Sequence, residues 1–236
     1  MNPRRSLFTL LLATATGCFM PPRPVPRFDA QANFAAWVDR HDIRLSRLPD
    51  GGDGVVEPPG FSLSRTRRYT LVRDGKTTAE LDLTAPGTVA VQQARADTPE
   101  GGGVDPTWEQ NAIRLTLRTP GAATFHTEEF HRSDNGGAPE RIARNAQYNV
   151  DLRGEFRAVV RDEQGADVGW IRVRLGPYFA APRIYDGVLP AQLSPGVAAA
   201  IPVALGSELD WIESQTVDLY KEGTGGGLHQ SFPMTK

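Results

Sequence analysis

The feature that most constrains the fold of this chain is a pair of alternating apolar stretches separated by a short turn. Residues 149–160 and 168–175 place apolar side chains at every second position, the period of a half-buried β-strand. Gln164-Gly165 predicts the turn between them and sets Phe156 opposite Val173 and Ala158 opposite Ile171. In this register one face of the hairpin is apolar and is expected to be buried. That face comprises Leu152, Phe156, Val160, Ile171, Val173 and Leu175.

Other short strands are predicted by the same alternation, with glycine and proline between them. Asp74-Gly75 indicates a type I′ hairpin joining residues 67–73 to 76–83. Residues 113–117 alternate, and residues 122–131 are expected to pair with them across Pro120-Gly121. A further strand is expected at 88–91, and loops at 97–106 and 133–139. The fold class is therefore predicted to be mostly β, an antiparallel sandwich-like domain of immunoglobulin-like or barrel-like form.

A short N-terminal helix is the one helical element that the pattern predicts clearly. Asp29 can cap residues 29–41, in which Phe34, Trp37 and Val38 lie at i, i+3 and i+4 on one face.

The C-terminal part of the chain is harder to assign. Residues 197–205 are continuously apolar and are expected to form a buried strand. Residues 209–220 fit either a helix capped by Ser207 or another strand, and the glycine-rich tail 223–236 is expected to be loose.

Composition limits the domain organisation and the classes of partner. With 39% hydrophobic residues, the β-rich part, residues 28–236, can bury a core as one domain or as two sandwiches divided near 132–145. The net charge of −2 and the lack of a basic tract argue against binding of nucleic acid.

The N-terminus has the features of an export signal. Arg4-Arg5 is followed by an apolar stretch, residues 6–16, which is too short to cross a bilayer as a helix. Ala15-Thr16-Gly17-Cys18 resembles the lipobox of bacterial lipoproteins. The resemblance implies a signal peptide at 1–17 and a Cys18 that carries acyl chains such as palmitate, with the lipid bilayer as its partner.

Residues 18–27 are then the lipidated cysteine and a proline-rich tether, with four prolines in residues 21–27. Because Phe19 follows the cysteine, the outer membrane is favoured over the inner membrane as the place of anchoring. Two alternatives stay open: a simple secretory signal with Cys18 as a free thiol, and export by the twin-arginine route.

The polar face of the first hairpin is the candidate ligand-binding surface. Arg157 would lie opposite Arg172, which is unfavourable unless an anion bridges the two guanidinium groups. The alternative is a solvated sheet face whose arginines pair with carboxylates of neighbouring strands. The candidate residues are Arg153, Arg157, Arg161, Trp170, Arg172 and Arg174.

No motif predicts a metal, a cofactor or a catalytic nucleophile. His126 and His131 in the stretch HTEEFH do not have the spacing of a zinc helix, and the loop 50–54 lacks the ligand ladder of a calcium site. No G-x-S-x-G element is present. The aromatic residues Tyr178, Phe179 and Tyr185 would either stack on sugars or fill the end of the core.

These features favour a membrane-anchored envelope lipoprotein with a non-catalytic β-rich domain that binds or has a structural or assembly role. Its expected partners are envelope polysaccharide or another envelope protein. The alternative is a hydrolase that acts on envelope glycan or peptidoglycan with a site of loop carboxylates or histidines.

Overall fold

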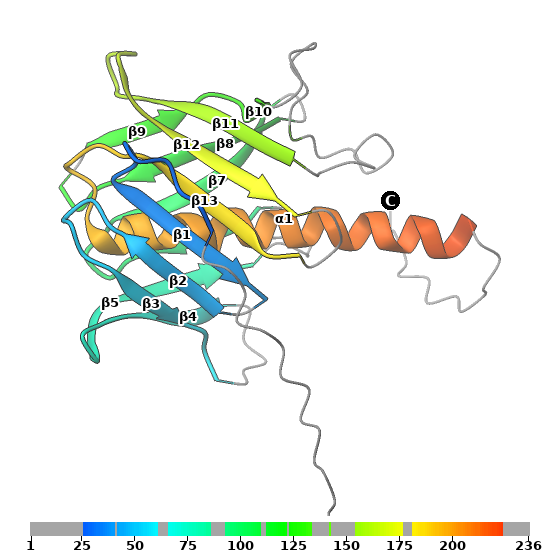
Figure 1. Cartoon of the computed structure of the whole chain (residues 1–236), viewed down its shortest axis with the longest axis horizontal. Coiled ribbons are helices and arrows are strands. Elements are labelled where there is room, and N and C mark those ends of the chain that lie inside the picture. Colours follow the sequence, from blue (N-terminus) through cyan, green and yellow to red (C-terminus); the bar gives the residue numbers. More distant parts are fainter. Residues whose placement is uncertain are drawn as a thin grey trace, which may run out of the picture.

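In the computed structural model of the chain, the described strands form one sheet, and the chain then continues into one helix (Figure 1). The described residues are 26–40, 42–60, 66–85, 93–109, 112–121, 123–133, 142, 154–176 and 181–223, with side chains described up to 213. The strands are β1 (Phe34–Asp39), β2 (Asp42–Arg47), β3 (Gly54–Glu57), β4 (Thr66–Arg73), β5 (Lys76–Thr84), β6 (Arg95–Asp97), β7 (Gly103–Glu109), β8 (Ala112–Arg118), β9 (Thr124–Thr127), β10 (His131–Arg132), β11 (Gly154–Arg161), β12 (Asp167–Leu175) and β13 (Arg183–Val188). The helix is α1 (Pro195–Gly223).

The sheet closes on itself and forms an antiparallel barrel of twelve strands. The order runs β11-β12-β13-β1-β2 and then in sequence to β9, and β9 pairs with β11 to complete the ring. The two-residue β10 continues the line of β9 along the same edge of β11. The predicted β class is therefore confirmed in its barrel-like form, whereas the sandwich is wrong. Strands on both sides of residues 132–145 belong to this one sheet.

Helix α1 fills the interior of the barrel. A ring of eight strands leaves room only for its own side chains, so a ring of twelve needs additional material inside it. Residues 196–206 are buried at every position, which means that protein surrounds this part of the helix on all sides. The helix packs most closely on β5, β6 and β7, and Figure 1 shows it running between these strands and β1.

Small side chains allow the helix to fit. The buried stretch contains Ala198, Ala199, Ala200 and Ala204, with glycine at 196 and 206. Ser194 caps the helix, because its Oγ accepts a hydrogen bond from the Val197 N–H at 3.3 Å. The cap is thus thirteen residues ahead of the predicted Ser207, and residues 209–220 are helical.

The predicted helix at 29–41 and the predicted strand at 197–205 are both wrong. Residues 34–39 form β1, which pairs with β13 on one side and β2 on the other. Residues 197–205 lie within α1. The molecule therefore has its described helix near the C-terminus rather than at the N-terminus.

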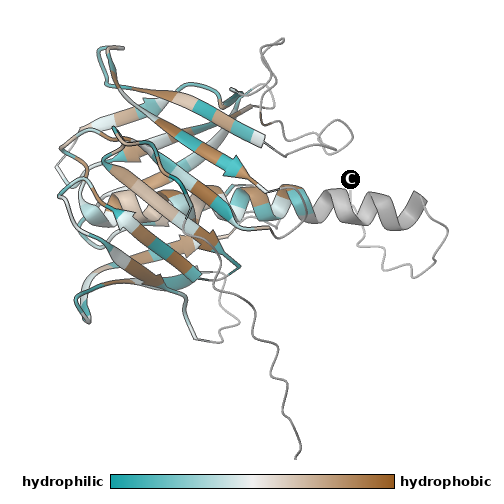
Figure 2. Ribbon diagram, in the orientation of Figure 1, coloured by the Kyte–Doolittle hydropathy of each residue, from teal (hydrophilic) through white to brown (hydrophobic). Residues whose placement is uncertain are grey.

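Two predicted hairpins are confirmed in detail. In β11 and β12, Phe156 lies opposite Val173 and Ala158 opposite Ile171. The predicted inner side chains of this pair that the structure describes are buried, and Figure 2 shows the alternation of hydrophobic and hydrophilic residues along the strands. Asp74 and Gly75 both have positive φ, 49° and 70°, as a type I′ turn requires.

The outcome for the remaining predicted segments is mixed. Residues 124–127 pair with β8, as predicted. The predicted loop 97–106 is too long, because β7 begins at Gly103. The expected strand at 88–91, most of the loop 133–139 and the tail after residue 223 lie outside the described residues.

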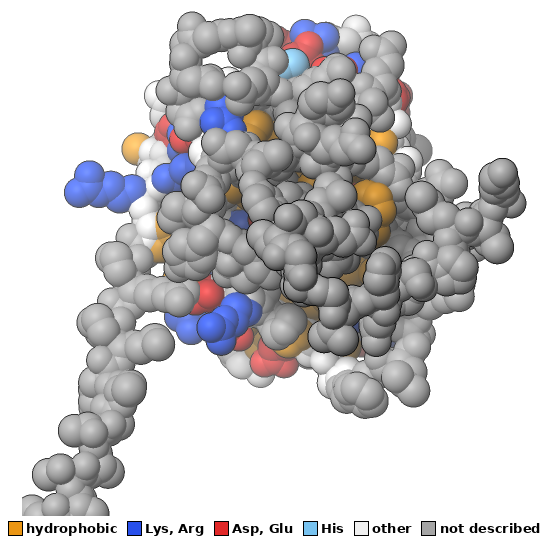
Figure 3. Space-filling model, turned by 90° about the vertical axis from the view of Figure 1, so that its right-hand side faces the viewer, with side chains coloured by type: hydrophobic (Ala, Val, Ile, Leu, Met, Phe, Trp, Pro, Cys, Tyr) orange, Lys and Arg blue, Asp and Glu red, His pale blue; other side chains and the backbone are white. Residues whose placement is uncertain are grey.

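The two ends of the barrel differ. Figure 1 shows that the turns joining β4 to β5 and β11 to β12 lie at the end where α1 begins. The helix leaves through the other end. Figure 3 views this second end, where charged side chains of both signs lie around the rim.

Candidate functional site

The outer face of β11 and β12 carries the predicted arginines, and Trp170 lies between two of them. The register places Arg157 opposite Arg172, as predicted. The guanidinium carbon of Arg157 lies 4.4 Å from the centroid of the Trp170 ring, and that of Arg172 lies 5.5 Å from it. The aromatic ring thus interacts with both cations by cation–π contact.

Arg172 is neutralised by a carboxylate of the adjacent strand β13. Its Nε and Nη2 donate to the two oxygens of Asp186 at 2.7 and 2.6 Å, a bidentate pair. Asp186 is fully buried. Burial by itself would raise the pKa of this carboxyl group, but the hydrogen bonds from Arg172 and from the Asp29 N–H outweigh burial and hold the pKa below its ordinary value. The same pair raises the pKa of Arg172.

The segment that precedes β1 lies against this face, and we call residues 26–33 the N-terminal strap. The Asp29 N–H donates to Asp186 at 2.9 Å, and Arg174 Nη2 donates to the carbonyl of Arg27 at 2.6 Å. Arg174 Nη2 also lies 3.2 Å from Asp186. Arg174 and Asp186 therefore bind the strap, which is a segment of the same chain.

Arg161 is also paired within the chain. It contacts Glu128 at 2.7 Å and Asp167 at 2.8 Å. Cys18 and Arg153 lie outside the described residues. Of the predicted arginines, Arg157 is the exposed one for which the described residues supply no carboxylate partner.

Sequence reasoning missed the residues that decide the behaviour of this face. Asp186 lies in a stretch for which no strand was predicted, and Asp29 was expected to cap a helix. Tyr185 beside it is buried in β13, in agreement with the core alternative. Asp186 lies only 14 residues after Arg172, but no alternation marks residues 183–188 as a strand that pairs with β12. Asp29 lies 157 residues from Asp186, which is beyond the range of local pattern.

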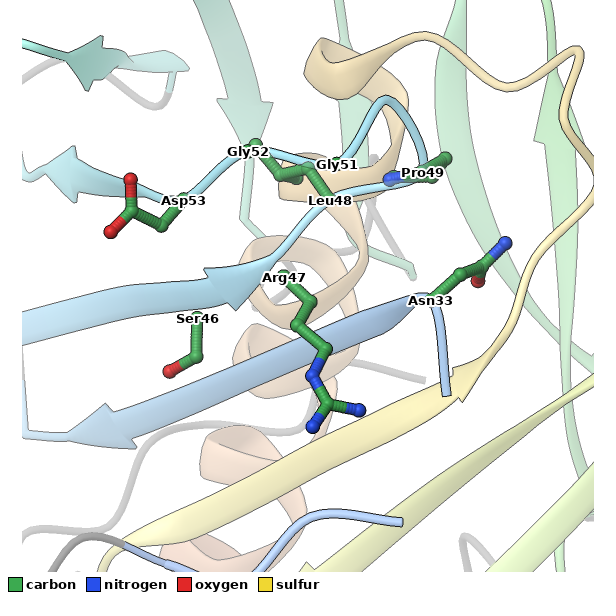
Figure 4. A pocket seen from close by; sticks show the side chains of 8 residues that line it. All are labelled: Asn33, Ser46, Arg47, Leu48, Pro49, Gly51, Gly52 and Asp53. Atoms are coloured by element: carbon green, nitrogen blue, oxygen red, sulfur yellow. The ribbon is translucent and has the colours of Figure 1, made fainter. Parts of the chain in front are cut away.

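A shallow hollow of about 490 Å³ lies on the other side of the strap (Figure 4). Asn33, Ser46, Arg47 and most of the loop 48–53 line it. Arg47 Nη1 donates to the carbonyls of Asp29 at 2.7 Å and Ala32 at 2.9 Å. Asp29 thus contacts Asp186 through its N–H and Arg47 through its carbonyl, so the strap separates this hollow from the Trp170 face.

A second polar cluster lies where α1 passes Arg183, the first residue of β13. Arg183 Nη1 donates to the Gly206 carbonyl at 3.0 Å, and its Nη2 lies 2.6 Å from Asp210 and 3.0 Å from Glu213. Beside it, burial raises the pKa of Tyr185 to about 12. Further round the barrel, the buried Glu208 accepts hydrogen bonds from the Ala94 N–H and from Trp108 Nε1. These contacts fix α1 within the barrel.

The predicted absence of a metal site stays a prediction. The His126 ring is 3.2 Å from the Thr116 hydroxyl, Glu128 pairs with Arg161, and Glu129 lies 3.4 Å from Arg114. Within the described ranges no group of three or more metal-ligating side chains comes together. The described helix is also not of a length and apolarity that would cross a membrane.

The fold and the strap define a class: a closed antiparallel β-barrel with a helix through its centre and its N-terminal segment bound on the outside. No protein-family model matches the sequence, and no curated protein or solved structure is significantly similar to it.

Proposed function

We propose that this chain is a cell-envelope lipoprotein, anchored through an acylated Cys18, whose barrel is a rigid, non-catalytic module that binds an anionic partner. The favoured place of anchoring is the outer membrane, after removal of residues 1–17. The partner is an envelope polysaccharide or another envelope protein. The observation that carries the binding role is the exposed Arg157, stacked on Trp170 with no carboxylate of its own among the described residues.

The filled interior supports a binding surface on the outside of the barrel. Since α1 takes up the centre, a partner would meet the outward faces of the strands and the loops. On the outward face of β11 and β12, the Trp170 ring contacts Arg172, which is neutralised by Asp186, and Arg157, for which no described residue supplies a carboxylate. An acidic group that approaches the ring would gain a charge-assisted hydrogen bond from Arg157 without breaking any ion pair between described residues.

Acylation is tested by growing cells that express the full chain with a clickable palmitate analogue. We expect the mature protein to carry the label and to fractionate with membranes. Cys18→Ser should abolish both results, because this is the only thiol in the chain. An unlabelled wild-type protein whose thiol reacts with maleimide would refute the lipid anchor and, with it, the proposed location of the barrel at the membrane.

Partner binding is tested by Arg157→Gln in the full chain, with retention on isolated peptidoglycan sacculi and on polygalacturonate as the measurement. Loss of one charge-assisted hydrogen bond at an exposed position should weaken retention about tenfold. Retention of the wild-type protein should also decrease as salt is raised.

Arg44→Gln is the matched control for this experiment. Arg44 is likewise exposed and lies 5.6 Å from the Trp37 ring, but no second arginine shares that ring in the described structure. Equal losses for both variants, or none for Arg157→Gln, would remove Arg157 from the binding surface. Arg172 is unsuitable for this test, because its substitution would leave the buried Asp186 without its main partner.

A further inference from the structure

The hollow beside the N-terminal strap has one basic side chain, Arg47, and this arginine has an unusual set of partners. Both hydrogens of its Nη1 are directed to backbone carbonyls, those of Asp29 and Ala32. Such acceptors are neutral, and within the described structure no carboxylate pairs with this guanidinium. The described residues therefore hold this positive charge in position without supplying a carboxylate that neutralises it.

The described hydrogen bonds of this guanidinium group all come from Nη1. A guanidinium has five N–H donors, and the strap uses the two on Nη1. The N–H of Nε and those of Nη2 form the side that pairs with the two oxygens of a carboxylate in parallel. Figure 4 shows the Arg47 side chain extending from the end of β2 across β1 at the hollow.

The walls of the hollow are already fixed. In the loop 48–53, the Leu48 N–H donates to the Gly52 carbonyl and the Gly51 N–H to the Leu48 carbonyl, both at 2.8 Å. Arg73 pairs with Asp50 at 2.5 Å, which neutralises that carboxylate. On the opposite side, the Asn33 amide is held by reciprocal hydrogen bonds with the backbone of Leu189. A ligand would therefore bind with little ordering of the protein.

We propose that this hollow is a binding site for a carboxylate group, with Arg47 as its anchor. One guanidinium supplies one positive charge, and no second basic side chain lines the hollow among the described residues, which suits a monoanion. Asp53 is at the rim with its carboxylate directed away from Arg47 (Figure 4), and its charge repels the dianionic form of phosphate more strongly than a monoanion. The site is distinct from Arg157, which lies beyond the strap, and does not depend on acylation of Cys18.

The test is a titration of the ¹⁵N-labelled full chain carrying Cys18→Ser, followed through the amide signals of Gly51 and Gly52. Two pairs of probes compare a carboxylate with an uncharged counterpart: glucuronate with glucose, and N-acetylalanine with its amide. Inorganic phosphate is the fifth probe. We expect at least one carboxylate to bind with a dissociation constant on the order of 1–10 mM, and its neutral counterpart and phosphate not to bind.

Arg47→Gln should weaken carboxylate binding at least tenfold, and Arg47→Lys should fail to restore it, because an ammonium group lacks the planar fork. Since Arg47 also holds the strap, a second variant is needed that leaves these hydrogen bonds intact. Ser46→Trp places a ring in the hollow from an exposed position of β2 and should abolish binding with an unchanged thermal unfolding temperature. Arg44→Gln, on the same strand, should bind as the wild type does.

Three outcomes would overturn the proposal. The first is equal binding of the acid and the neutral probe, the second is full binding by Arg47→Gln, and the third is loss of binding in Arg157→Gln, which would place the carboxylate at Trp170 instead. Which probe pair responds distinguishes a sugar acid from a peptide carboxyl terminus. The variant used here cannot be acylated, so failure of the titration leaves the lipoprotein proposal standing. Failure of the acylation experiment likewise leaves the proposed carboxylate site standing.

Discussion

A chain that ends after Ser194, and so lacks α1, is expected to lose its fixed tertiary structure. The helix contributes large aliphatic side chains to the centre of the barrel, all of them nearly or fully buried: Val197, Ile201, Val203, Leu205, Leu209 and Ile212. Full burial of each contributes about 1.5–3 kcal/mol, or about 9–18 kcal/mol for the set. Whole domains have stabilities of only about 5–15 kcal/mol. The strands without the helix therefore cannot keep a packed interior.

The measurement is urea unfolding followed by near-ultraviolet circular dichroism, with dye binding as a report of exposed apolar surface. The shortened chain should give a weak aromatic signal, bind the dye and unfold without a cooperative transition. The matched control ends after Gly223, which keeps all of α1 and removes only residues 224–236. We expect this control to unfold as the full chain does. A cooperative transition in the chain that ends at 194 would mean that the barrel has a core independent of the helix.

The sequence predicted local features well because they depend on neighbours within a few residues. Alternation at β11 and β12 gave the correct register, and Asp74-Gly75 gave the correct turn. The stretch that forms β1 satisfies two periods at once. Phe34, Trp37 and Val38 fit a helix face, but Phe34, Ala36 and Val38 also alternate, and pairing with β13 and β2 decides in favour of the strand.

The central helix was not predictable from periodicity. A helix that is surrounded by protein has no polar face, so residues 197–205 show the same continuous apolar character as a buried strand. Only closure of the ring by the pairing of β9 with β11 creates the space that the helix fills. That pairing joins segments about 35 residues apart in the chain, beyond the range of local pattern.

The sequence predicted which arginines share the outer face of β11 and β12, but not the groups with which they pair. The register correctly placed Arg157 opposite Arg172. Asp186 lies in another strand, and the strap lies in the N-terminal segment. The hairpin alone therefore predicts neither the ion pair of Arg172 nor the hydrogen bonds of Arg47 to the strap carbonyls. The pairing of β13 with β12 brings Asp186 to Arg172, and the position of the strap gives Arg47 its carbonyl partners.

Substitution of Arg183 by methionine is expected to destabilise the protein by about 3 kcal/mol. The side chain is 7% exposed and donates to the Gly206 carbonyl, Asp210 and Glu213. Removing one member of a buried ion pair costs about 3–5 kcal/mol, because the remaining polar groups stay buried without a partner. We expect the lower end of this range, since Asp210 is 72% exposed and can be hydrated again, whereas Glu213 and the Gly206 carbonyl cannot easily be.

The measurement for Arg183→Met is the urea midpoint at constant slope, compared with Arg161→Met. Arg161 also contacts two carboxylates, Glu128 and Asp167, but does so at the surface, where solvent already screens the charges, so its midpoint should change little. Adding Glu213→Leu to Arg183→Met should recover part of the lost stability, because it removes the carboxylate that has lost its contact with Arg183. Equal midpoints for the two single variants would mean that the Arg183 cluster is hydrated like a surface pair. The fixed position of α1 in the barrel would then depend on apolar packing alone.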